Sequence, residues 1–217
     1  ARLSVLAQTA AVNALAVAEM LFGLGQSARA FAVVTVGRGI GSGLVLDGQV
    51  YRGWRGGAGE FGHTVAEAGG RLCECGKRGC LEAYASETAL VRQVAERFPE
   101  VLAASAGSEG VERVLAAVRA GHPGVRQLLA EAGRRLGVAL ANLVNLFNPE
   151  FLVIGGEGVR LGEDYFRPME EALRENVFDG LGEGLAVHIQ PWGDEAWARG
   201  AAGLAIEGQV FAGPRWR

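Results

Sequence analysis

Residues 59–63 (GEFGH) and residues 73–82 (CECGKRGCLE) carry the most informative pattern in this chain. The second stretch holds all three cysteines of the protein, and His63 lies ten residues before the first of them. An odd number of closely spaced cysteines argues against a disulfide framework and favours a metal site. Three thiolates and one imidazole form a common closed ligand set for structural zinc. The predicted zinc ligands are His63, Cys73, Cys75 and Cys80.

Two other interpretations of the cysteines remain. Free buried cysteines behave as small hydrophobic residues, although here they lie among glycines and basic residues. A redox role is disfavoured by the spacing, which is Cys-x-Cys rather than Cys-x-x-Cys. Gly76 and Gly79 would let the loop fold back so that Cys80 reaches the ion. Four protein ligands leave no open position on zinc, so we expect it to hold His63 and its loop rather than to catalyse.

The composition excludes several classes of protein. With 217 residues, 49% of them hydrophobic, the chain can bury a sizeable core. A net charge of −3 argues against a segment that wraps nucleic acid by itself. No apolar run reaches the roughly 18 residues of a membrane span, and no export signal opens the chain. We therefore expect a cytoplasmic location and no membrane partner.

Hydrophobic periodicity predicts alternating strands and helices without a low-complexity linker. Short apolar runs predict strands over residues 3–7, 31–36, 44–46, 151–154 and 185–189. Helical periodicity predicts helices over residues 12–22, 87–98, 111–119, 124–146, 165–176 and 195–206, with Ser86 capping the second. Glycine-rich loops are expected over residues 37–43 and 54–59, and a hairpin turn at residues 47–48. This alternation predicts one α/β domain over residues 1–217.

The two stretches quoted first resemble the GExGH and CxCGxxGCxE signatures of the ROK family, which joins transcriptional repressors, open reading frames and sugar kinases. Residues 36–43 (VGRGIGSG) resemble its second phosphate loop, and residues 145–156 (NLFNPEFLVIGG) resemble its adenosine-side segment. The resemblance implies an actin-like ATPase fold, which is ribonuclease H-like. The family's amino-terminal lobe, with its first phosphate loop, has no counterpart here, so the chain is expected to be mainly the carboxy-terminal lobe.

The resemblance also implies site residues. Glu60, His63 and Glu82 correspond to family residues that contact sugar hydroxyls, as carboxylates and a zinc-bound imidazole can do. The alternative is that both glutamates are solvated surface acids, as most glutamates are. The glycine segments imply weaker candidates for nucleotide contact, because such loops are common without nucleotide. These candidates are Gly37, Gly39, Gly41, Gly155 and Gly156.

One departure from the family decides the functional interpretation. The family's kinases carry an Asn-Asp pair before a helix that ends in Ala-Glu, and the Asp is the general base. Counting back from Glu19, this pair is replaced by Ala10 and Ala11, and no carboxylate nearby can substitute. Arg38 stands where the kinases usually have Thr; it could bind an anion or be an ordinary surface arginine. We therefore assign no catalytic residue and do not expect ATP as a cofactor.

These residues favour a sugar-responsive transcriptional regulator, of which this chain would be the effector-binding part. Its partners would be a sugar effector and operator DNA, the latter bound by a winged helix expected upstream of Ala1. A homodimer or tetramer is expected. Two alternatives stay open: an ATP-dependent, glucokinase-like sugar kinase, against which Ala11 argues, and a structural lobe that only assembles with partners.

Overall fold

A five-stranded mixed sheet forms the centre of the computed structural model, which describes residues 2–103, 108–192, 195–196, 198–200 and 202–203. The strands are β1 (Phe31–Val36), β2 (Ile40–Leu46), β3 (Gln49–Val50), β4 (Phe151–Gly155) and β5 (Ala186–Gln190). Their order across the sheet is β3-β2-β1-β4-β5. β2 is antiparallel to β1 and β3, whereas β4 is parallel to β1 and β5. The predicted α/β class is confirmed.

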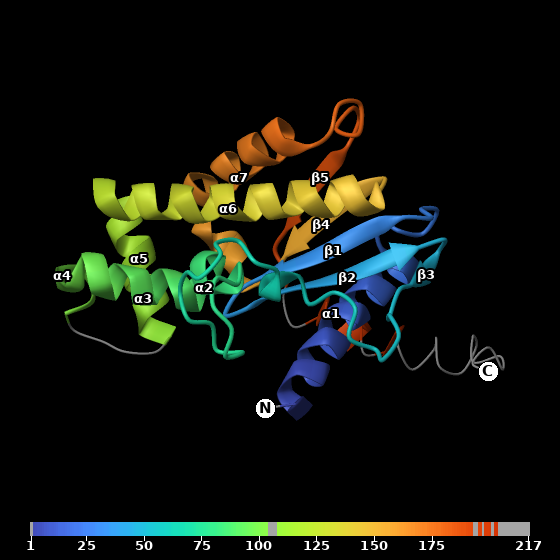
Figure 1. Cartoon of the computed structure of the whole chain (residues 1–217), viewed down its shortest axis with the longest axis horizontal. Coiled ribbons are helices and arrows are strands. Elements are labelled where there is room, and N and C mark those ends of the chain that lie inside the picture. The colour runs from blue at the N-terminus through green and yellow to red at the C-terminus, as the bar shows by residue number, and fades with distance from the viewer. Residues whose placement is uncertain (1, 104–107, 193–194, 197, 201, 204–217) are drawn as a thin grey trace.

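Helices cover both faces of the sheet (Figure 1). The helices are α1 (Arg2–Phe22), α2 (Glu82–Ala85), α3 (Glu87–Arg97), α4 (Pro99–Leu102), α5 (Ser108–Arg119), α6 (Pro123–Phe147) and α7 (Glu163–Asn176). Two short 3₁₀ helices, η1 (Phe61–His63) and η2 (Glu157–Leu161), lie in the loops. None of the helices in the described part has both the length and the apolar composition needed to cross a bilayer.

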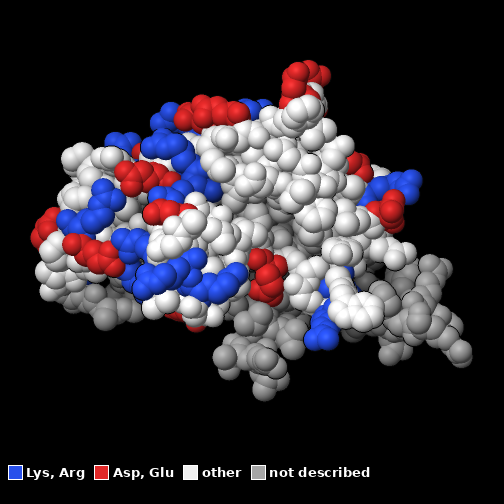
Figure 2. All heavy atoms as spheres, in the orientation of Figure 1, with Lys and Arg blue, Asp and Glu red and all other residues white. Residues whose placement is uncertain are grey.

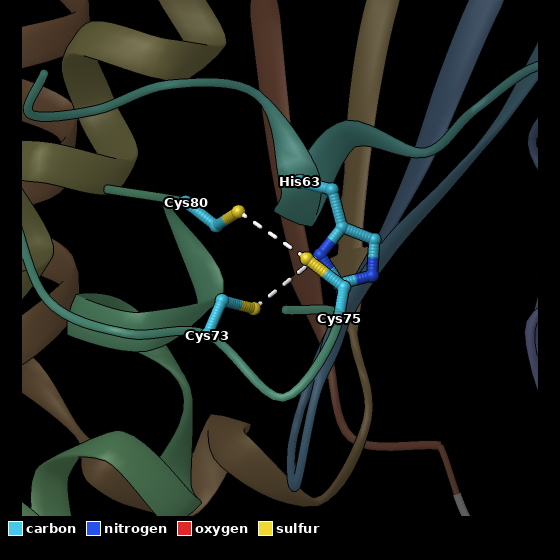
Figure 3. A group of neighbouring side chains, drawn as sticks. All are labelled: His63, Cys73, Cys75 and Cys80. Carbon is cyan, nitrogen blue, oxygen red and sulfur yellow. Dashed lines mark hydrogen bonds between the residues drawn. The ribbon is translucent and has the colours of Figure 1, made fainter. Parts of the chain in front are cut away.

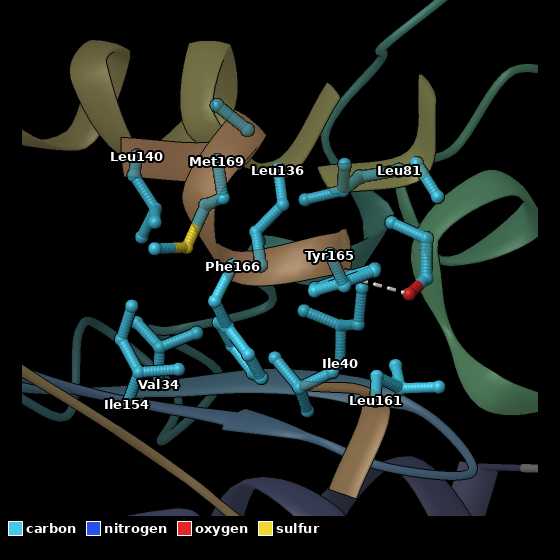
Figure 4. Close-up of a cluster of buried hydrophobic side chains, with 14 of the residues drawn as sticks. Val34, Ile40, Leu81, Leu136, Leu140, Ile154, Leu161, Tyr165, Phe166 and Met169 are labelled. Atoms are coloured by element: carbon cyan, nitrogen blue, oxygen red, sulfur yellow. Dashed lines mark hydrogen bonds between the residues drawn. The ribbon is translucent and has the colours of Figure 1, made fainter. Parts of the chain in front are cut away.

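Strand alternation produces a core on each face of the sheet. In β1, Val34 and Val36 join a large core beneath α6 and α7. Figure 4 shows Tyr165 and Phe166 of α7 in this core, where the buried Tyr165 hydroxyl donates to the Ala85 carbonyl at 2.8 Å. Phe31 and Val33 face the other side and pack with α1. Burial of both faces explains why the central strands read as continuous apolar runs.

Two local predictions are wrong. Residues 3–7 belong to helix α1, not to a strand. A five-residue apolar run cannot be told from a helix by periodicity alone, and no turn residue separates it from the helix that follows. The loop expected over residues 37–43 ends at Gly39, because β2 begins at Ile40. Glycine is needed inside β2 because a Cβ at Gly43 would lie 2.9 Å from the Val12 carbonyl oxygen of α1.

The helix expected over residues 12–22 ends as predicted but begins at Arg2, and the other expected elements in the described residues are found within a few residues of their predicted ends. Ser86 caps α3 by accepting a hydrogen bond from the Ala89 amide at 3.1 Å. Asp47 and Gly48 both have positive φ, as the tight hairpin between β2 and β3 requires. The helix expected over residues 195–206 lies partly outside the described residues, and the described ones from 195 to 203 are helical.

Candidate functional site

The four predicted metal ligands meet in one place (Figure 3). His63 ends η1, and the three cysteines come from the loop between η1 and α2. The His63 Nδ1 atom lies 3.6 Å from the Cys73 sulfur, and the Cys75 and Cys80 sulfurs lie 3.6 Å apart. All four ligand atoms lie within 4.8 Å of one another. The prediction that these residues converge is confirmed.

The donor set and its spacing fit a zinc ion. Tetrahedral zinc, with metal–sulfur bonds of about 2.3 Å, separates neighbouring ligand atoms by about 3.6–3.8 Å. The His63–Cys73 and Cys75–Cys80 separations match this spacing between the ligand atoms. Burial raises the pKa of the Cys73 thiol to about 12, so a bound metal would have to displace its proton. The residues present are therefore compatible with a closed structural metal site.

Backbone hydrogen bonds help to fold the cysteine loop. The Cys73 amide donates to the Lys77 carbonyl at 2.8 Å, and Gly76 donates back to Cys73 at 2.9 Å. Gly76 and Gly79 have φ of 88° and 82°, a left-handed conformation that favours glycine. The predicted fold-back at these glycines is confirmed, and it places the sulfurs on one side of the loop.

A cavity of about 470 Å³ lies beside this cluster. It is bounded by the end of β1, the segment between β1 and β2, the start of β2, the GEFGH stretch, and residues of the cysteine loop, α1, α2, α3 and η2. Its polar and charged lining residues are Thr35, Arg38, Ser42, Glu60, His63, Glu74, Glu82, Thr88 and Glu157. All three predicted sugar contacts, Glu60, His63 and Glu82, are therefore brought to one cavity.

His63 connects the cluster to the cavity. Its Nδ1 atom faces the cysteines, while its Nε2 atom lies 3.9 Å from Glu60 Oε2. Glu82 Oε2 accepts a hydrogen bond from the Ile40 amide at 2.9 Å. Glu82 Oε1 lies 3.9 Å from the Cys73 sulfur. Glu60 thus lies beside the imidazole, whereas Glu82 lies near the Cys73 sulfur and is already oriented by a backbone amide.

Ala11 of α1 lines the same cavity as Glu60 and Glu82. The position of Ala11 in the cavity wall is therefore consistent with the expectation that it stands where the family's kinases carry the general base. A methyl group at this position can neither accept a proton nor orient a hydroxyl group. The carboxylates that do line the cavity come from other segments of the chain.

The five candidate nucleotide glycines divide into two groups. Gly37, Gly39, Gly41 and Gly156 line the cavity, whereas Gly155 does not. A Cβ at Gly155 would lie 2.2 Å from the Trp192 ring, so this glycine allows the ring to pack closely on β4. At Gly37 and Gly39, a Cβ would meet the carboxylates of Glu157 and Glu82 at 2.4 and 2.7 Å. These two glycines make room for acidic side chains.

Three groups in or near the site were not predicted from the sequence. The Ile40 amide has no side-chain signal, because any residue except proline offers the same donor. Glu157, in η2, reaches the cavity because it directly follows the glycine pair. Arg160 pairs with the buried Glu87 seventy-three positions away. No local pattern identifies such a pair, because its two residues meet only in the folded chain.

Comparisons with known proteins agree on one family. The profile of the ROK family matches residues 4–208. The xylose repressor of Caldicellulosiruptor bescii is 31% identical over 89% of this chain and 50% of its own length. The glucokinase of Halalkalibacterium halodurans is 34% identical over 88% of this chain and 61% of its own length. The chain thus spans about half to three-fifths of these relatives.

A solved structure has the same fold. The crystal structure of a ROK family transcriptional regulator, a homologue of the E. coli MLC protein, superposes with a TM-score of 0.75. It is 33% identical and matches 89% of this chain and 50% of that chain. The strand order, with three antiparallel strands followed by two parallel ones, is that of the actin-like, ribonuclease H-like fold. The chain therefore belongs to the ROK family.

Proposed function

We propose that this chain is the effector-binding part of a sugar-responsive transcriptional regulator. Its relatives include both repressors and glucokinases, so the choice between the two rests on the residues of this chain. The observation that carries the proposal is Ala11, a methyl group in the wall of the cavity that holds Glu60 and Glu82. A sensor needs different affinities for its ligand in two states but needs no base.

Sugar recognition would use the two carboxylates and the imidazole. Each carboxylate can accept two hydrogen bonds from vicinal hydroxyl groups. Glu82 is oriented for this by the Ile40 amide, and Glu60 lies beside the imidazole at 3.9 Å. Their convergence on one cavity supports a polyhydroxylated ligand and argues against two unrelated surface acids.

Zinc would be held by His63, Cys73, Cys75 and Cys80 and would supply structural stability without chemistry. His63 would present its Nε2–H to the cavity, since a ligating imidazole uses its second nitrogen for an outer hydrogen bond. The 3.9 Å separation from Glu60 places an acceptor on that side. The proposal thus gives the cluster the task of positioning one sugar contact.

The partners follow from the same proposal. Operator DNA would be bound by a winged helix upstream of this chain, and the regulator would act in the cytoplasm as a homodimer or tetramer. Figure 2 shows a broad uncharged area over the carboxy-terminal half of α6, where Val138 is 41% and Leu146 is 78% exposed. This area offers a contact surface for such an oligomer.

The proposal is tested with the full-length protein and a panel of neutral sugars. We expect at least one sugar to raise the melting temperature, because a ligand that binds only the folded state stabilises it. The same sugar should change the affinity for operator DNA in a mobility-shift assay. If no sugar alters either property, the sensor proposal is wrong and a purely structural lobe becomes the better explanation.

Substitution of Glu82 by Gln is expected to weaken sugar binding while leaving the zinc content unchanged. A hydrogen bond to a charged group contributes about 1.5–3 kcal/mol, which corresponds to roughly a 10–150-fold loss of affinity. Gln can still accept from the Ile40 amide, so the local fold should persist. Calorimetry would measure sugar affinity. Glu131→Gln, on the surface of α6 outside this cavity, is the control and should bind sugar like the wild type. Loss of zinc in Glu82→Gln would contradict the separate roles of the metal site and the sugar site.

A further inference from the structure

An ion pair between the buried Glu87 and the partly exposed Arg160 joins α3 to η2. The Glu87 side chain is 1% exposed, and its two oxygens accept hydrogen bonds from Arg160 Nε and Nη2 at 2.7 and 3.0 Å. Arg160 Nη1 also contacts Glu112 at 3.1 Å, but Glu112 is 59% exposed. A buried carboxylate is costly unless it is paired, and the bidentate arginine contact fixes both partners in one geometry. Glu87 is therefore rigidly held.

The residues at the start of α3 also bind the cavity wall. The Glu87 amide donates to the Gly37 carbonyl at 2.9 Å, and the Thr88 hydroxyl donates to the Arg38 carbonyl at 2.9 Å. Two consecutive residues of α3 thus hold two consecutive carbonyls of the short segment that connects β1 to β2. This segment, residues 37–39, is followed directly by Ile40 of β2, whose amide donates a hydrogen bond to Glu82.

The same pair reaches the opposite wall of the cavity. Arg160 lies in η2, which starts at Glu157 directly after the Gly155–Gly156 pair. Glu157 and Gly156 line the cavity together with Gly37 and Gly39. Glu87 therefore links the two walls: its side chain pairs with Arg160 of η2, and its backbone amide donates to the Gly37 carbonyl.

We propose that Glu87, held by Arg160, is a positioning residue that fixes residues 37–40 and through the Ile40 amide orients the Glu82 carboxylate in the cavity. Glu87 and Arg160 are absent from the cavity lining, so any effect on a ligand must pass through the wall that they hold. The expected change in sugar affinity rests on the proposed function, whereas the expected change in the stability of residues 37–40 does not.

Hydrogen exchange of the zinc-loaded, full-length protein without sugar tests the effect on the wall. In Glu87→Gln, exchange of the Ile40 amide should accelerate about tenfold or more, because the local opening becomes easier. Glu112→Gln is the matched control, since it removes the solvent-exposed contact of the same arginine, and it should exchange like the wild type. Arg160→Lys keeps the charge but loses the bidentate contact, and it provides the same test if Glu87→Gln does not fold.

Sugar affinity provides the second measurement. Glu87→Gln should bind the sugar about tenfold more weakly than Glu112→Gln, with equal zinc content, if a misplaced Glu82 loses one good hydrogen bond. Unchanged exchange at Ile40 would overturn the inference, as would equal acceleration across the whole chain, which indicates a purely structural ion pair. Failure of the wild type to bind any sugar would instead defeat the proposed function, and the exchange data would still decide the role of Glu87.

Discussion

Sugar-dependent release of ADP is expected to stay at background in the full-length protein. Ala11 lines the cavity where a kinase would need a carboxylate, and a positioned general base contributes about 10²–10⁴-fold to the rate. None of the cavity carboxylates comes from α1: Glu60 precedes η1, Glu74 lies in the cysteine loop, Glu82 begins α2, and Glu157 begins η2. A coupled assay of ADP formation with saturating ATP and a panel of sugars measures this directly.

A glucokinase of the same family serves as the positive control in that assay. The Ala11→Asp variant separates two causes of inactivity. A gain of sugar-dependent ADP release in this variant would mean that the missing base alone separates the protein from an active kinase. Sugar-dependent ADP release by the wild type at the rate of the positive control would contradict the regulator proposal and would indicate a sugar kinase.

Substitution of Cys75 by Ser is expected to abolish zinc binding and to lower the melting temperature by about 5–10 °C, because loss of a structural metal is among the most destabilising single changes. Cys75 is exposed, unlike Cys73 and Cys80, so replacing its sulfur by oxygen should by itself cost little packing energy. The drop in melting temperature therefore reports the lost ligand. Elemental analysis for zinc and calorimetry make the two measurements.

Glu74→Gln is the control for this substitution. Glu74 lies between Cys73 and Cys75, and it pairs with Arg92 on the surface, where its side chain is 66% exposed. An exposed ion pair contributes at most about 1 kcal/mol, so this variant should keep its zinc and nearly all its stability. Retention of one zinc per chain and of the wild-type melting temperature in Cys75→Ser would rule out Cys75 as a ligand.

The sequence by itself predicted the fold class, the four residues of the candidate metal site and three side chains of the candidate sugar site. Its strongest signals are local: ligand spacing in residues 73–80, helical periodicity, and the two-residue turn at Asp47 and Gly48. Such patterns can be read because the residues that cooperate are close in the chain. The expectation that Ala11 stands where the family's kinases carry a carboxylate also came from the sequence, by counting back from Glu19.

Contacts between distant segments needed the tertiary structure. Residues 3–7 look like a strand in isolation, yet they extend α1, because helix and buried strand share the same short apolar pattern. Gly43 sits inside a strand because α1 approaches β2 closely, and Glu87 is buried because Arg160 meets it across the fold. Each of these features depends on packing between segments far apart in sequence, because the contacts that stabilise it form only in the folded chain.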